Sequence, residues 1–331
     1  MSSSGLPPST IPIFTTVGSY REWRRRAFDE RQTVGFVPTM GALHDGHLSL
    51  VKRSLLDNDL TVVSIFVNPA QFAPHEDLTT YPRTLPRDLE LLTALSIPNL
   101  DRTASAVFLP TVQEMYPSGI DQDVTNQRGT FIEVKGYGHQ MEGRVRPTFF
   151  RGVATVVTKL FNAIEPTNAY FGQKDIQQGL LLRRLSRDLL LSHPDPAHLH
   201  IIPTARDPKD GLALSSRNVY LSPLERQFAP TLYSALKEAQ NAWSDGNDKS
   251  TCIRKAVERI EQKQREASGV GVEMKLDYVE MNHSDSFDVL EGEARQRSMG
   301  DHPIILSGAI WVGRTRLIDN VILGDEHTIV G

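Results

Sequence analysis

Short apolar runs alternate with amphipathic segments over the first two thirds of the chain. The runs are rich in Val, Ile or Phe and are bounded by Gly, Pro or Asn, a pattern that predicts buried strands. They lie at Val34–Val37, Thr61–Val67, Ala106–Leu109, Ala169–Phe171 and Leu199–Ile202. Helical periodicity occupies His47–Leu56, Pro86–Ala94, Gly152–Ile164 and Ile176–Leu190. This alternation predicts an α/β fold whose parallel sheet is covered by helices on both faces.

The pattern changes after Pro203. A Ser/Arg/Asn loop at 215–218 is followed by helical segments at Pro223–Asp245 and Ser250–Ala267, and a polar loop is expected at 283–303. Strand patterns come last, at Lys275–Met281, Ile304–Trp311 and Thr315–Asn320. We therefore expect an α/β domain at 13–203 and a smaller C-terminal α+β domain at 204–331. Residues 1–12 are expected to form a flexible tail, because their Ser, Pro and Gly offer nothing to pack.

Composition and charge narrow the class of protein. The 331 residues carry 36 basic and 40 acidic side chains, a net charge of −4, so no broad surface for nucleic acid is expected. The single cysteine, Cys252, excludes an intrachain disulfide and a cysteine-rich zinc site, which fits a reducing compartment. No apolar run approaches the ~18 residues that span a bilayer. The Arg-rich stretch Ser19–Arg31 also holds acidic residues, which favours a solvated helix face over a transit peptide. We expect a cytoplasmic protein that binds no membrane.

The strongest candidate for chemistry is the segment 34–51, VGFVPTMGALHDGHLSLV. A predicted strand ends there in a turn, and His44-Asp45-Gly46-His47 opens a helix. Free backbone N–H groups and the positive end of the helix dipole then point beyond the sheet edge, where two imidazoles can donate to phosphate oxygens. A histidine pair that caps the helix or binds a metal is the alternative. The glycines and the strand–turn–helix context favour phosphate.

Two further segments lie where predicted strands end. FVNPAQF at 66–72 offers the neutral side chains of Asn68 and Gln71 to a polar substrate, although Asn-Pro is also an ordinary turn signal. FGQKD at 171–175 offers the Lys174 ammonium to a phosphate, and Asp175 to a ribose hydroxyl or magnesium. A solvated Lys–Asp pair in a surface turn is the alternative for the second segment.

A fourth segment, DGLALSSRNVYLSP at 210–223, reads as a polar loop. Ser215 and Ser216 offer hydroxyl donors, and the planar guanidinium of Arg217 matches a phosphate. Such a loop can close over a nucleotide, although Ser-Ser-Arg triplets also occur in loops without function.

Together these segments resemble the pantothenate synthetase (pantoate–β-alanine ligase) family of the His-x-x-His nucleotidylyl transferase superfamily. The matching pieces are VPTMGALHDGH, SIFVNPAQF, YPRT, RPTFFRGVATVVTKLFN, FGQKD-x-QQ, DGLALSSRNVYL and, at 313–320, GRTRLIDN. The resemblance implies a Rossmann-like domain that binds nucleotide and pantoate, followed by a lid domain. It also implies a homodimer that uses ATP and Mg²⁺, joins pantoate to β-alanine through pantoyl adenylate, and releases AMP and pyrophosphate.

The resemblance also assigns roles to single residues. The implied ATP contacts are Met40, Gly41, Ala42, Leu43, His44, Asp45, Gly46, His47, Gly172, Gln173, Lys174, Asp175, Ala205, Leu214, Ser215, Ser216 and Arg217. The implied catalytic residues, which would surround the triphosphate, are His44, His47, Lys174 and Arg217. The implied pantoate contacts are Gln71, Gln178, Val153, Val156, Val157 and Phe171, and Gln71 would also lie near β-alanine. No metal ligand is assigned.

Three positions depart from the family pattern. Phe149 stands where the family commonly has His, which removes a polar group near the pocket rim. The stretch 206–209 is one residue longer than usual, which shifts the assignment of Ala205 by up to one position. Arg87 stands where many members have an acidic residue beside Asp88, which weakens any assignment of magnesium ligands there.

Two other functions are compatible with the motifs. The first is a His-x-x-His nucleotidylyl transferase that acts on a phosphorylated substrate, but the neutral Gln71 and Gln178 favour a carboxylic acid. The second is a nucleotide-binding protein that has lost catalysis. The complete set of His, Lys, Asp and Arg residues speaks against it, since a motif counts only with all its roles filled.

Overall fold

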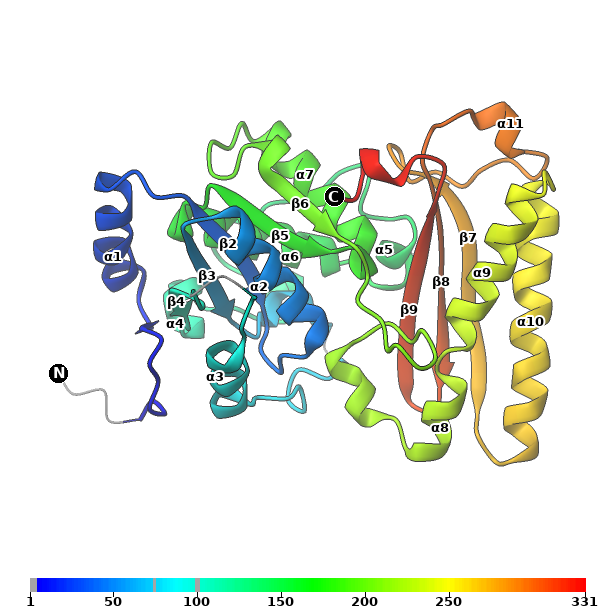
Figure 1. Ribbon diagram of the computed structural model, residues 1–331, viewed down its shortest axis with the longest axis horizontal. Helices are drawn as coiled ribbons and strands as arrows, with labels where there is room; N and C mark the ends of the chain where they lie inside the picture. Colours follow the sequence, from blue (N-terminus) through cyan, green and yellow to red (C-terminus); the bar gives the residue numbers. More distant parts are fainter. Residues whose placement is uncertain (1–4, 74–75, 99–101) are drawn as a thin grey trace. The chain divides into compact units, whose positions relative to one another are not determined.

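The computed structural model describes residues 5–73, 76–98 and 102–331, which divide into two compact units (Figure 1). The first unit comprises Met1–Phe171 and Leu181–His200, and the second comprises Gly172–Leu180 and Ile201–Gly331. The segment 172–180, with Lys174 and Gln178, thus belongs to the same unit as the C-terminal part of the chain.

The first unit is built on a parallel sheet with the strand order β1-β4-β3-β2-β5-β6. The strands are β1 (Ile13–Phe14), β2 (Val34–Thr39), β3 (Leu60–Ile65), β4 (Ala106–Phe108), β5 (Asn168–Gly172) and β6 (Leu199–Ile202). The central strands β2 and β3 are almost continuously buried, as expected where both faces of a parallel sheet are covered. Because β2 pairs in parallel with β3 and β5, their carboxyl ends lie at one edge, where ligands bind in such folds.

Helices cover both faces of this sheet. The helices in this part of the chain are α1 (Val17–Asp29), α2 (Asp45–Asp57), α3 (Leu85–Ala94), α4 (Val112–Met115), α5 (Glu142–Val145), α6 (Phe149–Ile164) and α7 (Ile176–Asp188), with 3₁₀ helices η1 (Pro69–Gln71), η2 (Val124–Asn126) and η4 (Pro196–His198). The first residues of α7, up to Leu180, belong to the second unit. Two neighbours in β2 show the two faces, since successive side chains of a strand point in opposite directions. A Cβ on Gly35 would overlap the Ser54 side chain of α2, whereas the Phe36 ring lies 6.4 Å from the Phe161 ring of α6. The predicted fold class is confirmed.

The N-terminal segment differs from the expected tail. Residues 1–4 lie outside the described residues, but Ile11 is only 3% exposed, and the Pro12 carbonyl accepts a hydrogen bond from the Val107 N–H at 2.8 Å. This contact leads into β1, which the pattern did not predict because a two-residue strand carries no measurable periodicity.

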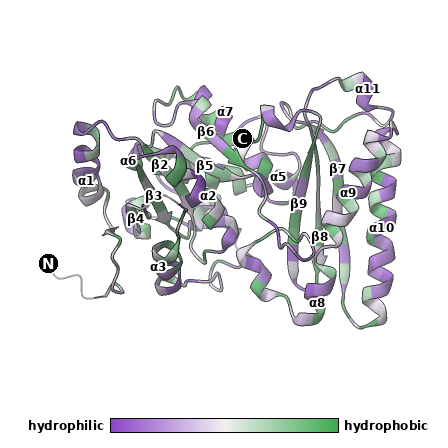
Figure 2. Ribbon diagram, viewed as in Figure 1, coloured by the Kyte–Doolittle hydropathy of each residue, from purple (hydrophilic) through white to green (hydrophobic). Residues whose placement is uncertain are grey.

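The second unit contains an antiparallel sheet in the order β7-β8-β9. Its elements are β7 (Met274–His283), β8 (Ile304–Val312), β9 (Thr315–Leu323), α8 (Pro223–Phe228), α9 (Thr231–Ser244), α10 (Lys249–Gly269) and α11 (Gln296–Met299), with 3₁₀ helices η3 (Gln173–Asp175), η5 (Ser216–Tyr220) and η6 (Glu326–Thr328). Helices α9 and α10 pack against the sheet. Figure 2 shows α10 with mainly hydrophilic colouring, because it buries a narrow stripe that includes Cys252, Ala256 and Ile260.

Three predictions for this unit are wrong in detail. The single helix expected at Pro223–Asp245 is two helices, α8 and α9, because Pro230 has no backbone N–H and its ring blocks a continuous helix. The expected polar loop at 283–303 contains α11 and buries Phe287 and Leu290, which are 1% and 3% exposed. Most of the loop expected at 215–218 is the 3₁₀ helix η5.

Candidate functional site

The histidine pair lies at the start of α2, directly after the turn that follows β2. His44 is the N-cap residue, and its Nδ1 accepts a hydrogen bond from the Gly46 N–H at 3.1 Å. This bond places the proton of a neutral His44 ring on Nε2. The His47 ring lies against it, with centroids 4.1 Å apart. Two imidazoles therefore share the positive end of one helix, an environment that favours an anion. His44 does cap the helix, but capping accounts for one nitrogen only.

Asp88 of α3 holds the turn that precedes the histidines. Gly41 and Ala42 have φ values of 83° and 50°, which is strained for the alanine. The N–H groups of Ala42 and Leu43 donate to the two Asp88 carboxylate oxygens at 3.0 and 2.8 Å, and the Thr84 hydroxyl donates at 3.0 Å. Asp88 is 1% exposed. Its carboxylate therefore stabilises the turn conformation that leads into the histidine pair.

Gln71 lies in η1, next to the same turn. Its Nε2 donates to the Met40 sulfur at 3.3 Å, and its Oε1 accepts from the Asn68 amide at 3.1 Å. Asn68 is 1% exposed; its amide also donates to the Gly152 carbonyl at 3.3 Å, and its oxygen accepts from the Tyr116 hydroxyl at 2.6 Å. Burial raises the pKa of Tyr116, which keeps this hydroxyl protonated as the donor. Asn68 thus supports Gln71 from within the protein.

The apolar candidates are buried in the first unit. Val153, Val156 and Val157 are 3%, 4% and 5% exposed, and their spacing places them on one face of α6. Phe171, near the end of β5, is 5% exposed. Phe149 is the first residue of α6, and the Arg146 guanidinium lies 3.9 Å above its ring, a cation–π contact that also suits an aromatic residue at this position. These residues form part of a core, and their contact with a ligand stays a prediction.

In the second unit, η3 carries Gln173, Lys174 and Asp175, and Gln178 follows in the first turn of α7. The Lys174 ammonium lies 3.3 Å from the Asp175 carboxylate, and the two side chains are 20% and 44% exposed. The Lys174 side chain is therefore less exposed than expected for the solvated surface pair that was the alternative for this segment.

The segment 205–214 forms a hairpin that absorbs the extra residue. The Leu214 N–H donates to the Ala205 carbonyl at 3.0 Å, and the Asp207 N–H donates to the Leu212 carbonyl at 2.9 Å. The insertion at 206–209 lies inside the hairpin, so it leaves Ala205 and Leu214 paired. Beyond the hairpin, the Ser215 hydroxyl accepts from the Arg217 N–H at 3.3 Å and caps η5.

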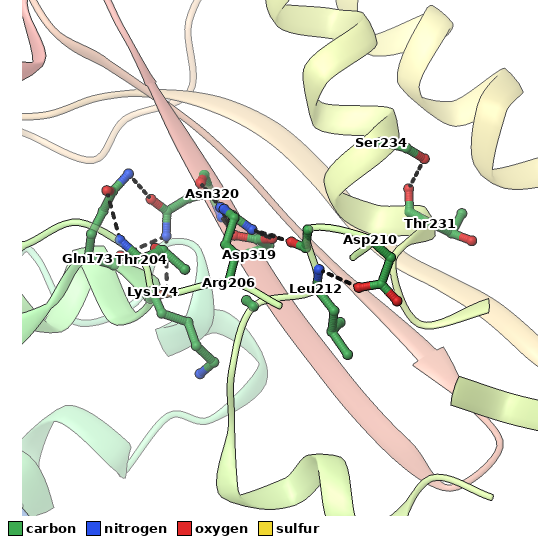
Figure 3. A network of polar contacts seen from close by, with 12 residues as sticks. Gln173, Lys174, Thr204, Arg206, Asp210, Leu212, Thr231, Ser234, Asp319 and Asn320 are labelled. Atoms are coloured by element: carbon green, nitrogen blue, oxygen red, sulfur yellow. Dashed lines mark hydrogen bonds and ion pairs between the residues drawn. The ribbon is translucent and has the colours of Figure 1, made fainter. Parts of the chain in front are cut away.

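A polar network connects η3 with β9 (Figure 3). Asn320 donates to the carbonyl oxygens of Gln173 and Lys174 at 2.8 and 3.0 Å. Beside it, Arg206 and Asp319 form a two-pronged ion pair with distances of 2.6 and 2.8 Å. Burial raises the pKa of Asp319, and the Arg206 guanidinium opposes this effect and favours the carboxylate. The motif GRTRLIDN contains Asp319 and Asn320, but the sequence alone did not show which residues these two side chains contact.

The described residues show no cluster of three or more His, Cys, Asp or Glu side chains that could hold a metal ion. Asp88, beside which many family members have a second acidic residue, uses both oxygens on the turn and on Thr84. The neighbouring Arg87 lies at the surface, 3.6 Å from Glu90. Within the described ranges, Asp88 is therefore occupied by the turn, and no group of such side chains is arranged to hold magnesium by itself. In the described ranges, no helix has the length and apolarity to cross a membrane.

The structure brings several predicted residues together within each unit. In the first unit His44 lies against His47, and Met40 contacts Gln71. In the second unit Lys174 pairs with Asp175. Sequence reasoning missed the roles of Asp88 and Asn320, although both stand in segments that it quoted. The use of residues from both units on one substrate stays a prediction.

Comparison with known proteins identifies the relatives of the chain. The sequence model of a family described as pantoate-beta-alanine ligase matches residues 12–322. The chain is 43% identical over 314 residues to a pantothenate synthetase of Thermotoga petrophila, covering 95% of this chain and 100% of the relative. It is 41% identical over 327 residues to a pantoate–beta-alanine ligase of Saccharomyces cerevisiae, with coverage of 95% and 100%.

Solved structures show the same similarity. A pantothenate synthetase of Thermus thermophilus has a TM-score of 0.75 and 39% identity, covering 94% of this chain and 99% of that chain. A pantoate-beta-alanine ligase of Francisella tularensis, complexed with beta-gamma ATP and β-alanine, has a TM-score of 0.68 and 31% identity, covering 95% and 98%.

Proposed function

The chain belongs to the pantoate-beta-alanine ligase family and is a ligase, and we propose that it joins pantoate to β-alanine with the cleavage of ATP. The observation that carries this proposal is the His44–His47 pair at the amino end of α2, since such a helix end binds anions such as a triphosphate. The Francisella tularensis relative, complexed with beta-gamma ATP and β-alanine, supports two of the three substrates.

The proposed reaction has two steps. In the first, a carboxylate oxygen of pantoate attacks the α-phosphorus of ATP, and the bond to the β-phosphate oxygen breaks, which gives pantoyl adenylate and pyrophosphate. In the second, the β-alanine amine attacks the acyl carbon, AMP leaves, and the amine loses a proton. Because the substrates supply both nucleophiles, the protein has to position them and to offset charge.

Charge repulsion is the main obstacle to the first step. Two like charges ~4 Å apart repel by about 4 kcal/mol at an effective dielectric constant of 20. We propose that Lys174 and Arg217 offset this repulsion with fixed positive charge. His44 and His47 would donate hydrogen bonds that follow the charge as pyrophosphate leaves. The remaining proposed ATP contacts are Met40 to Gly46, Gly172, Gln173, Asp175, Ala205, Leu214, Ser215 and Ser216.

Neutral amides are proposed to hold pantoate. Gln71 is fixed by Asn68 and contacts Met40, so its amide has a defined direction before a substrate arrives. Gln71 and Gln178 can orient the pantoate carboxylate without neutralising it, which keeps the oxygen nucleophilic. Gln71 would also serve β-alanine, and the apolar pantoate methyls would lie against Val153, Val156, Val157 and Phe171.

Magnesium enters this proposal only with the nucleotide. Mg²⁺ is commonly bound by substrate phosphates and water with few protein ligands, which is compatible with the absence of a ligand cluster among the described residues. A homodimer in the cytoplasm is proposed from the family resemblance. Sedimentation of the purified chain measures the first point, and microscopy of a tagged chain in cells measures the second.

The decisive experiment is the substrate dependence of ATP cleavage. We expect pyrophosphate from ATP when pantoate is present, AMP and pantothenate once β-alanine is added as well, and neither AMP nor pyrophosphate without pantoate. A second expected result is a fall of ~10²-fold or more in the adenylation rate of His47→Ala, the scale for loss of one transition-state donor. Turnover of a phosphorylated substrate in place of pantoate would instead favour a different nucleotidylyl transferase.

A further inference from the structure

The motif GRTRLIDN has no part in the chemistry proposed above, yet it ends in two enclosed polar residues. Asp319 and Asn320 of β9 are 5% and 1% exposed. Buried polar side chains destabilise a fold unless their atoms are hydrogen-bonded, so the partners of these two residues indicate what they do. As neighbours in a strand, they point to opposite faces of the sheet and engage different parts of the second unit.

Asn320 uses its whole amide on the segment that carries Lys174. Its nitrogen donates to the backbone carbonyls of Gln173 and Lys174 at 2.8 and 3.0 Å, and its oxygen accepts from the Gln173 side chain at 3.2 Å. The Gln173 oxygen in turn accepts from the Thr204 N–H at 3.4 Å. In Figure 3 the Lys174 side chain extends away from this network, which holds its backbone only. The backbone of Lys174 is thus fixed, while its ammonium lies outside this hydrogen-bond network.

Asp319 and Arg206 support Asn320 from the other face. The Asp319 carboxylate accepts from both Arg206 nitrogens at 2.6 and 2.8 Å and from the Asn320 N–H at 2.8 Å. Arg206 also donates to the Gly211 carbonyl at 3.1 Å and lies 3.7 Å above the Tyr233 ring. A planar ion pair with this many contacts has one low-energy geometry, so it fixes the strand position from which Asn320 reaches η3.

A second buried asparagine of the same sheet forms a local hydrogen bond, in contrast to the long-range bonds of Asn320. Asn282 of β7 is 0% exposed and donates to the Phe287 carbonyl at 2.9 Å, five positions along the chain. Its bond closes its own loop. The bonds of Asn320 instead reach backbone atoms 146 and 147 positions away, in the segment of a proposed catalytic residue.

We propose that Asn320 is a positioning residue for Lys174, with Asp319 and Arg206 holding it in place. The role of Lys174 on the triphosphate rests on the proposed function, whereas the anchoring of its backbone does not. A lysine side chain loses much rotamer freedom when its ammonium binds a phosphate. A backbone that is already fixed limits the additional conformational entropy lost on binding.

The test is a double-mutant cycle in the full-length chain. Asn320→Asp keeps the shape of the side chain. It replaces the amide nitrogen, which donates two hydrogen bonds, with an oxygen acceptor that faces the same two carbonyl oxygens. Asn282→Asp makes the same change at the matched control position. We expect Asn320→Asp to lower the rate of pantoate-dependent AMP formation about tenfold or more, and Asn282→Asp to stay within about twofold. In a Lys174→Ala background, Asn320→Asp should cost less than about twofold further, because its effect acts through the lysine.

Hydrogen exchange of peptides covering 172–180 gives a readout that needs no activity. We expect faster exchange there in Asn320→Ala than in the unmodified chain or in Asn282→Ala. Equal losses of rate from Asn320→Asp with and without Lys174, or unchanged exchange in Asn320→Ala, would overturn the inference. Failure of the unmodified chain to form AMP with pantoate and β-alanine would refute the proposed function alone, and the exchange measurement would still decide whether Asn320 anchors this segment.

Discussion

The turn before the histidine pair depends on one carboxylate, and Asp88→Asn tests that dependence. An asparagine has one acceptor oxygen where Asp88 offers two, so its amide nitrogen would face the N–H of either Ala42 or Leu43. A buried donor left without an acceptor costs about 1–3 kcal/mol of the free energy of unfolding. The strained φ of 50° at Ala42 adds to the tendency of the turn to change conformation.

The same substitution should affect chemistry through the histidines. The turn leads directly into His44 and His47, and a misplacement of about 1 Å can cost ~10² in rate. We expect Asp88→Asn to lower the rate of pantoyl adenylate formation by about 10- to 100-fold. The assay combines pyrophosphate release at saturating substrates with urea unfolding, which reports the expected loss of stability in the same preparation.

The matched control is Thr84→Val. It removes the hydroxyl that donates to Asp88 but leaves both backbone bonds of the turn, so it should retain most of the rate. Recovery of Asp88→Asn by raised Mg²⁺ would refute the reasoning, because it would show that the carboxylate binds metal instead of the turn. A normal rate and an unchanged free energy of unfolding in Asp88→Asn would refute it as well.

Three further predictions test other features of the chain. Gly152→Ala should destabilise the protein and raise the pantoate KM, although alanine favours helices. The added Cβ would overlap the Ala70 carbonyl and displace η1 together with Gln71. Unchanged kinetics and an unchanged melting temperature would contradict this. Burial lowers the pKa of His200 below its ordinary 6.5, so the unfolded chain binds more protons there, and stability should fall as the pH drops through 6.5; His200→Gln should flatten that slope in urea titrations from pH 5 to 7.5. Burial raises the pKa of the Cys252 thiol to about 11, so its labelling by a disulfide reagent at pH 8 should be at least about 100-fold slower than in urea, and equal rates would refute the assignment.

Most of the parallel sheet could be predicted because its strands are defined by local pattern. Runs such as Val34–Val37 are apolar on both faces and end at turn residues, and the observed strand Val34–Thr39 continues only into that turn. β1 was missed because its two residues gain their strand conformation from pairing with β4, more than ninety positions away. The break between α8 and α9 was available in the sequence, since Pro230 marks it, but the surrounding periodicity concealed it.

The candidate site was predictable in its chemical groups but not in its supports. Motif spacing pointed to His44, Gln71 and Lys174, whereas the partners of Asp88 and Asn320 come from distant parts of the chain. Asp88 binds the turn across 46 positions, and Asn320 binds η3 across 147. Local periodicity records which face of an element is buried, but it does not record which buried polar atom meets which backbone group.

Asp88 binds backbone hydrogen-bond donors, whereas Asn320 binds backbone acceptors, and this difference explains why one residue is an aspartate and the other an asparagine. The turn before α2 presents backbone N–H groups, and a carboxylate with two acceptor oxygens, Asp88, satisfies two of them. The segment at η3 presents carbonyl oxygens, and Asn320 satisfies two of them with its amide nitrogen, a donor that a carboxylate lacks. Asp88→Asn and Asn320→Asp are therefore opposite exchanges of the same two groups, and each puts like against like. If both supports act by hydrogen-bond complementarity, each exchange should impair its own segment although the side-chain volume hardly changes. Tolerance of both exchanges would mean that packing alone holds these segments.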